Sequence, residues 1–218
     1  MKKCFWAKAV AAGALALSAS GAWSQTVLYT TLPAPAAGGP CFGGGRLAAV
    51  EVLTPAGAPY QINSATVRMH HADDPAASFS LGVYTDNAGA PGTLVAAIGT
   101  AAGNGLGTFD QYSLTPAAPI ALAPATNYWV VASSASADDC AFGWTSGASA
   151  PSGLFSYVTE AQFLPPAWVG RPDARQALQL DGATATPAAV AAVPTLSEWA
   201  MLLMLSSVLV VGMRRLRG

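Results

Sequence analysis

The stretch F-S-L-G-V-Y-T-D-N-A-G-A-P-G-T-L-V-A-A-I-G-T, from Phe79 to Thr100, decides the fold expected for this chain. Phe79, Leu81 and Val83 alternate with smaller or more polar residues and therefore share one face of an extended strand. The segment from Asp86 to Gly92 is rich in residues that tolerate tight or left-handed turns. A second apolar run follows directly, so the stretch predicts an antiparallel hairpin.

Similar runs recur along the chain between residues 25 and 182. Short apolar alternations are separated by Gly, Pro, Asn and Asp, and no long helical period interrupts them. This spacing predicts an all-β protein, an antiparallel β-sandwich of jelly-roll type. The expected strands are Arg46–Leu53, Ile62–His71, Ser78–Thr85, Thr93–Ile98, Thr108–Leu114, Asn127–Ser133, Ala141–Thr145, Gly153–Thr159 and Ala177–Leu180.

Two further runs complete a pattern with the hairpin. L-A-P-A-T-N-Y-W-V-V-A-S spans Leu122 to Ser133, and F-G-W-T spans Phe142 to Thr145. Together with the hairpin they resemble the choice-of-anchor β domains of bacterial surface proteins. The resemblance covers about two-thirds of the body between Gln25 and Gly182. It implies a β domain that carries one of several C-terminal anchors, and it implies no catalytic residues.

The C-terminal region, residues 193–218, has three parts in strict order. An apolar run from Ala200 to Met213 separates a motif from a basic end. The region resembles the IPTL-CTERM sorting signal of Gram-negative bacteria, with Val193 where the family has Ile and Ala200 where it has Gly. The resemblance implies recognition by an exosortase-type membrane peptidase. The motif residues are Val193, Pro194, Thr195, Leu196, Ser197, Glu198 and Trp199, and the stop-transfer residues are Arg214, Arg215 and Arg217.

The membrane span in this region is short. From Trp199 to Met213 it has 15 residues, which gives about 22 Å as a transmembrane helix at 1.5 Å per residue. A hydrocarbon core is about 30 Å thick. The span therefore favours a removable sorting signal, with a plain permanent membrane anchor as the alternative.

The pattern of the N-terminal residues 1–24 predicts a signal peptide. Lysines precede an apolar segment from Ala9 to Leu17, and a small-residue exit predicts cleavage between Ser24 and Gln25. The Sec translocon and signal peptidase are the partners this implies. The precursor would cross the inner membrane once, with a periplasmic body and a cytoplasmic C-terminus, and the mature form would reach the cell surface or the medium.

The exported body, residues 25–182, is acidic once the charges are sorted by segment. All lysines lie in the signal peptide, and between Gln25 and Val193 four arginines face ten carboxylates, which gives a formal charge of −6. This charge argues against nucleic-acid binding. The body is long enough for one domain, and the Ala/Thr/Pro-rich residues 183–192 predict an extended linker to the sorting signal.

Two cysteines remain in the mature body, Cys41 and Cys140. In an oxidising periplasm an even pair favours a disulfide, here across a loop of about 100 residues. Two separate buried thiols are the alternative.

Candidate catalytic residues are few. The sequence has no G-x-S-x-G, H-E-x-x-H or C-x-x-C motif, and His70 and His71 are its only histidines. Adjacent strand residues point to opposite faces, so these two histidines are poorly placed for one metal ion. We therefore expect no enzyme, no cofactor and no metal site.

A ligand contact is more plausible at an aromatic side chain, since tryptophan can stack on a sugar ring. Trp129, inside an apolar run, is expected in the core, whereas Trp168, between prolines and Gly170, is expected in a loop where it could contact a ligand. The sequence thus predicts a non-enzymatic protein of the envelope, surface or extracellular matrix. The alternative is a carbohydrate-binding module at the cell surface, with exopolysaccharide as its partner.

Overall fold

The computed structural model describes residues 25–34, 38–71, 77–103, 107–146, 149–172 and 174–185. These residues form β-strands and no helix, so none of the described segments is a helix that could cross a membrane. The predicted signal peptide and sorting signal lie outside the described residues.

The strands are β1 (Thr26–Thr30), β2 (Cys41–Phe42), β3 (Leu47–Leu53), β4 (Tyr60–His71), β5 (Ser78–Asp86), β6 (Pro91–Ala102), β7 (Phe109–Leu114), β8 (Ile120–Leu122), β9 (Asn127–Ser134), β10 (Phe142–Trp144), β11 (Ser156–Leu164), β12 (Ala167–Gly170) and β13 (Leu178–Thr184).

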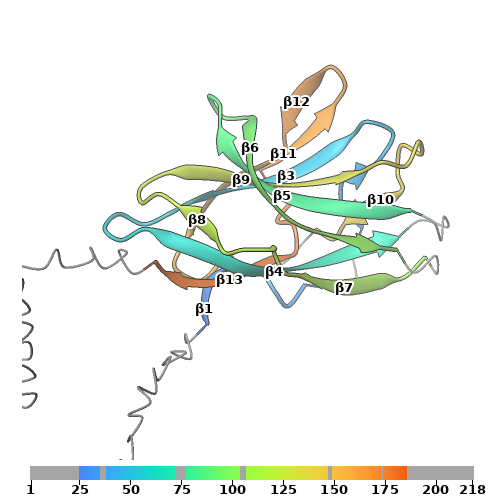
Figure 1. Cartoon of the computed structure of the whole chain (residues 1–218). Helices are drawn as coiled ribbons and strands as arrows, with labels where there is room; N and C mark the ends of the chain where they lie inside the picture. The colour runs from blue at the N-terminus through green and yellow to red at the C-terminus, as the bar shows by residue number, and fades with distance from the viewer. Residues whose placement is uncertain are drawn as a thin grey trace, which may run out of the picture.

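The strands form two antiparallel sheets that lie face to face (Figure 1). The first sheet has seven strands in the order β1-β13-β4-β10-β2, with β7 and β8 paired to the other edge of β4. The second sheet has six strands in the order β12-β11-β3-β9-β5-β6. The all-β, sandwich-like class predicted from the sequence is thus confirmed.

The hairpin from Phe79 to Thr100 is the β5–β6 pair. Asn87 and Ala90 exchange backbone hydrogen bonds across its turn, and Asp86 Oδ1 accepts a bond from the Gly89 amide at 3.0 Å. Ala88 and Gly89 both have positive φ, at 56° and 83°. Two such residues in a row are what a type I′ hairpin turn requires.

The main core lies between the sheets and follows the predicted alternation. Phe79, Leu81 and Val83 of the second sheet are buried against residues of the first. Phe79 contacts Phe142 with ring centroids 5.2 Å apart, and Phe142 stacks on Phe42 at 5.6 Å. These aromatic contacts join the two sheets, and edge-to-face pairs add to the free energy of burial.

One of the two tryptophan predictions needs correction. Trp129 is fully buried, as expected, and lies in a second core cluster with Ala49, Val131 and Ala161 on the outer face of the second sheet. Strand parity explains this, because Tyr128 and Val130 take the inward positions of β9. Trp168 lies in strand β12 and not in a loop.

Four strands were not expected from the sequence: β1, β2, β8 and β12. The hydrogen-bonded sheet also continues to Thr184, two residues into the segment expected to be linker. Beyond it, the Ala185 amide donates to the Pro59 carbonyl. The last described residue therefore lies beside the start of β4.

Candidate functional site

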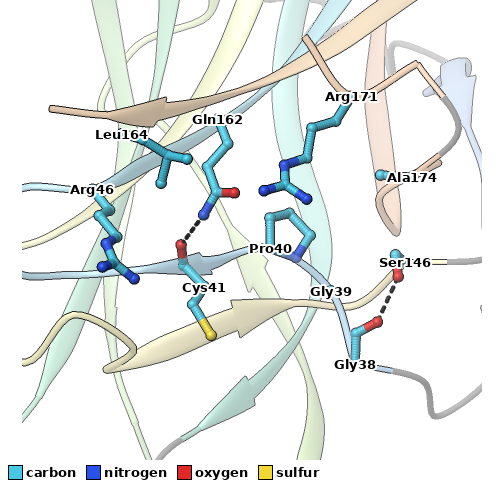
Figure 2. Close-up of a pocket in the computed structure, with 10 residues that line it drawn as sticks. All are labelled: Gly38, Gly39, Pro40, Cys41, Arg46, Ser146, Gln162, Leu164, Arg171 and Ala174. Carbon is cyan, nitrogen blue, oxygen red and sulfur yellow. Dashed lines mark hydrogen bonds between the residues drawn. The ribbon is translucent and has the colours of Figure 1, made fainter. Parts of the chain in front are cut away.

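An open groove of about 600 Å³ lies where both sheets contribute residues (Figure 2). The segment that leads into β2 of the first sheet forms one wall, and β11 of the second sheet forms another. The segments after β10 and β12 complete it. The lining residues are Gly38, Gly39, Pro40, Cys41, Arg46, Ser146, Gln162, Leu164, Arg171 and Ala174.

The groove wall before β2 is fixed to the body by hydrogen bonds. Gln162 Nε2 donates to the Cys41 carbonyl, and Ser146 Oγ donates to the Gly38 carbonyl (Figure 2). Gly39 passes so close to β10 that a Cβ there would lie 1.6 Å from the Trp144 carbonyl oxygen. Only glycine allows this approach, so the wall has a defined position.

A disulfide also fixes the position of this groove wall. Cys41 and Cys140 are joined, with Cα atoms 4.7 Å apart and a sequence separation of 99. The bridge connects β2 to the segment that carries Asp138 and Asp139. Long cross-links stabilise mainly by restricting the unfolded chain, and this one also ties the groove to an acidic loop.

Two arginines give the groove its charge. Arg46 makes an ion pair with Asp139 at 2.7 Å, between side chains that are 36% and 62% exposed. Exposed pairs of this kind are weak. The backbone amide of Arg171 donates a hydrogen bond to the Glu160 carbonyl. The Arg171 guanidinium makes no ion pair with any of the described residues. In Figure 2 the two guanidinium groups lie on either side of Gln162.

A second hollow of about 510 Å³ adjoins the groove. Val169, Gly170, Arg171, Pro172 and Ala174 line it, so Arg171 and Ala174 belong to both hollows. Val169 pairs with Gln162 across β11 and β12 and therefore lies on the same face of the hairpin. The two hollows thus form a continuous surface with Arg171 at their junction.

A buried polar cluster lies behind the groove, on the inward face of β11. Glu160 pairs with the core residue Val50 and is fully buried. Its Oε1 accepts a hydrogen bond from the Gln176 amide, whereas its Oε2 has no partner among the described residues. Other buried polar atoms in this cluster also have no hydrogen-bond partner among the described residues: the hydroxyls of Tyr29 and Thr145 and the side-chain amide of Gln176. Buried polar atoms of this kind are sites for internal water.

Burial dominates the electrostatics of this cluster. It raises the pKa of Glu160 to about 7, although the amides of Gln176 and Arg175 and the charge of Arg175 oppose the change. Burial also raises the pKa of Tyr29 well above its ordinary range, and the neighbouring Glu160 and Tyr157 add to the effect. A carboxyl group without full solvation is more stable protonated.

The structure places the other residues singled out from the sequence apart from the groove. Trp168 contacts Phe163, with ring centroids 5.4 Å apart, and packs against the cluster that contains Trp129. His70 contacts the ring of Phe109 at 4.9 Å. The described residues contain no group of three or more His, Cys, Asp or Glu side chains that could hold a metal ion. Residues 193–199 and the arginines at 214, 215 and 217 lie outside the described segments.

Arg46, Arg171, Gln162 and Ser146 were not singled out from the sequence. The charge distribution held one usable signal, because the body has only four basic residues and two of them line this groove. No local motif marks the two arginines, since Arg46 and Arg171 lie more than 100 residues apart in the sequence. Sequence reasoning chose the aromatic residue of β12 and missed the arginine that follows the same strand.

Comparison with known proteins bears on the C-terminal region. Residues 191–218 match the family model of the IPTL-CTERM motif. No curated protein and no solved structure matches the chain, so the resemblance of the body to choice-of-anchor domains stays a prediction. The sorting-signal prediction is confirmed: the chain carries an IPTL-CTERM motif at its C-terminal end.

Proposed function

We propose that this protein is an exported, non-enzymatic component of the cell surface or extracellular matrix, delivered through exosortase-type sorting. The observation that carries the proposal is the IPTL-CTERM match over residues 191–218. The order of motif, apolar run and arginines supports it, because each part suits a different layer of a membrane. The N-terminal signal peptide, with cleavage before Gln25, supplies the export step.

The body that this route delivers is proposed to be a jelly-roll-type sandwich that acts by its surface and not by catalysis. The non-enzymatic part rests on the sequence, which lacks hydrolase and metalloprotease motifs and has two histidines, adjacent to each other. Glu160, the carboxyl group with the most raised pKa among the described residues, is fully buried in the sandwich, where it cannot contact a substrate.

Processing of the C-terminus tests the sorting part of the proposal. The mature protein would be purified from its native host and its intact mass measured. We expect a chain that begins at Gln25 and ends near the Pro194–Trp199 motif. Pro194→Ala should retain Gly218, whereas Ala188→Ser in the linker should be processed normally. A wild-type protein that keeps Gly218 would show a plain membrane anchor and refute the sorting proposal.

A further inference from the structure

We propose that the groove binds a polysaccharide that carries carboxylate groups, with Arg171 as its main contact and Arg46 as a second. The inference rests on the proposed function, since it gives a ligand to a body exported to the cell surface. It names a site and a ligand class that the sorting motif does not specify. Three properties of the groove lead to it: charge, shape and position.

The charge argument concerns where an anion can bind on an acidic body. The segment from Gln25 to Val193 carries four arginines against ten carboxylates, so most of its surface repels anions. The groove gathers two of those arginines. A guanidinium group matches a carboxylate with two parallel hydrogen bonds, and Arg171 has no competing ion pair among the described residues. An anionic ligand is therefore directed to this groove.

The shape argument concerns what kind of anion fits. Two adjoining hollows of about 600 and 510 Å³ share Arg171 and Ala174. Each hollow offers apolar surface, from Pro40 and Leu164 in one and from Val169 and Pro172 in the other. Consecutive sugar rings present apolar faces of this kind to a protein, and a carboxylate between them would lie at Arg171. A single small anion would use only the junction.

The polar groups beside the arginines also match a sugar. The Gln162 amide nitrogen donates to the Cys41 carbonyl, and its Oε1 lies on the side that faces Arg171 (Figure 2). Ser146 Oγ donates to Gly38 and keeps lone pairs for a donor. The groove thus combines cationic donors with neutral acceptors, which suits a ligand that carries both carboxylates and hydroxyl groups.

The position argument concerns access from solvent. The segment before β13 lines the groove at Ala174, and β13 then runs from Leu178 to Thr184 away from it. β1 is antiparallel to β13 and pairs Thr26 with Gly182. Thr184 at the end of β13 therefore lies about 20 Å along the strand from Leu178, at 3.3 Å per residue, and Thr26 of β1 lies beside that end. A body tethered through its C-terminus would present the groove away from the attachment.

Binding of polygalacturonate to the mature protein from its native host tests the inference. Fully methyl-esterified polygalacturonate has the same rings without the charge and serves as the control ligand. We expect saturable binding of the acid form only. Arg171→Gln should weaken it at least about tenfold, the effect of losing a charge-assisted hydrogen-bond pair. Asp139→Asn, which releases Arg46, should strengthen it about two- to threefold.

Trp168→Ala serves as the matched control variant. Trp168 pairs with Phe163, whereas the groove residues Gln162 and Val169 occupy the alternate positions, so the tryptophan side chain lies on the opposite face. Its loss should leave polygalacturonate binding unchanged. Each variant would be compared with the wild type in its thermal unfolding midpoint, so that a loss of binding is not confused with a loss of fold.

Several outcomes would overturn the inference. These are the absence of polygalacturonate binding, equal binding of the methyl ester, and binding that depends on Trp168 but not on Arg171. Binding of polyglutamate in place of polygalacturonate would assign the groove to an acidic protein segment instead. Sorting is measured separately by the C-terminal mass. A retained Gly218 together with Arg171-dependent binding would therefore refute the sorting proposal and leave the groove assignment intact.

Discussion

Replacing Glu160 by glutamine should remove a pH dependence that this carboxyl group gives to the stability of the body. Glu160 is fully buried on the inward face of β11. Burial raises its pKa from 4.5 to about 7, and the amides of Gln176 and Arg175 and the charge of Arg175 oppose that rise. In the unfolded chain, by contrast, the carboxyl group loses its proton near its ordinary pKa.

The sign and size of the effect follow from this difference. Below pH 4.5 Glu160 is protonated in both states, and its contribution to stability is fully present. Between pH 4.5 and 7 the folded state holds a proton that the unfolded state has released, so stability falls as the pH rises. The gap between 4.5 and about 7 corresponds to about 3 kcal/mol, since each pH unit is worth about 1.4 kcal/mol.

Glutamine keeps the shape and the acceptor oxygen but does not titrate. At pH 5 Glu160→Gln should be close to the wild type, and at pH 8 it should be more stable by up to about 3 kcal/mol, or roughly 6 to 12 °C in unfolding midpoint. Urea unfolding followed by tryptophan fluorescence at a series of pH values measures the difference.

The matched control is Thr145→Val, which removes another unpartnered polar atom of the cluster but no titrating group. Thr145→Val should shift the stability at all pH values and keep the wild-type slope. A wild-type stability that is constant from pH 5 to 8 would refute the reasoning. So would a Glu160→Gln variant whose slope equals that of the wild type, because another group would then carry the dependence.

Three further changes test the fold. Cys41→Ala with Cys140→Ala should lower the free energy of unfolding by up to about 4.7 kcal/mol, the loop-entropy value for a loop of about 100 residues, as measured in urea. Gly182→Ala should lower the free energy of unfolding by at least about 2 kcal/mol, because a Cβ there would lie 1.9 Å from a backbone oxygen of β4. Gly170→Ala is the control and should be neutral, since a Cβ there would have nothing within 4 Å. Equal thermal midpoints for the two variants would contradict this packing. Trp129→Phe should cost about 1 to 3 kcal/mol through loss of the indole hydrogen bond of 2.9 Å to a carboxylate, and an unchanged urea midpoint would show that this bond contributes nothing.

The sequence was informative where a strand is long and half-buried. The alternation of Phe79, Leu81 and Val83 predicted the inward face of β5, and the turn residues at 86–92 predicted the hairpin. The missed strands are short or lie at an edge. β2 has two residues and is defined by its pairing with β10 and by the disulfide. Local pattern cannot identify an element whose partners are about 100 residues away.

The candidate site was less predictable than the fold for the same reason. Arg46 and Arg171 are isolated in the sequence, and only the antiparallel pairing of β3 with β11 and of β11 with β12 brings their segments together. Trp168 attracted attention because an aromatic residue among prolines suggests a loop. Its register opposite Phe163 instead places it on the outer face of the sheet.

That register also separates two physical modes of sugar binding on this body. An aromatic platform at Trp168 would bind by stacking, which depends weakly on ionic strength, whereas Arg171 would bind a carboxylate through an exposed charge that salt screens. The two candidate surfaces lie on opposite faces of the β11–β12 hairpin, so one ligand ring cannot use both. Raising the salt from about 0.1 M to 1 M shortens the screening length from about 10 Å to 3 Å. Polygalacturonate binding in the groove should then weaken strongly, because salt screens the attraction between Arg171 and the carboxylate and leaves only the contacts with the apolar and neutral polar lining.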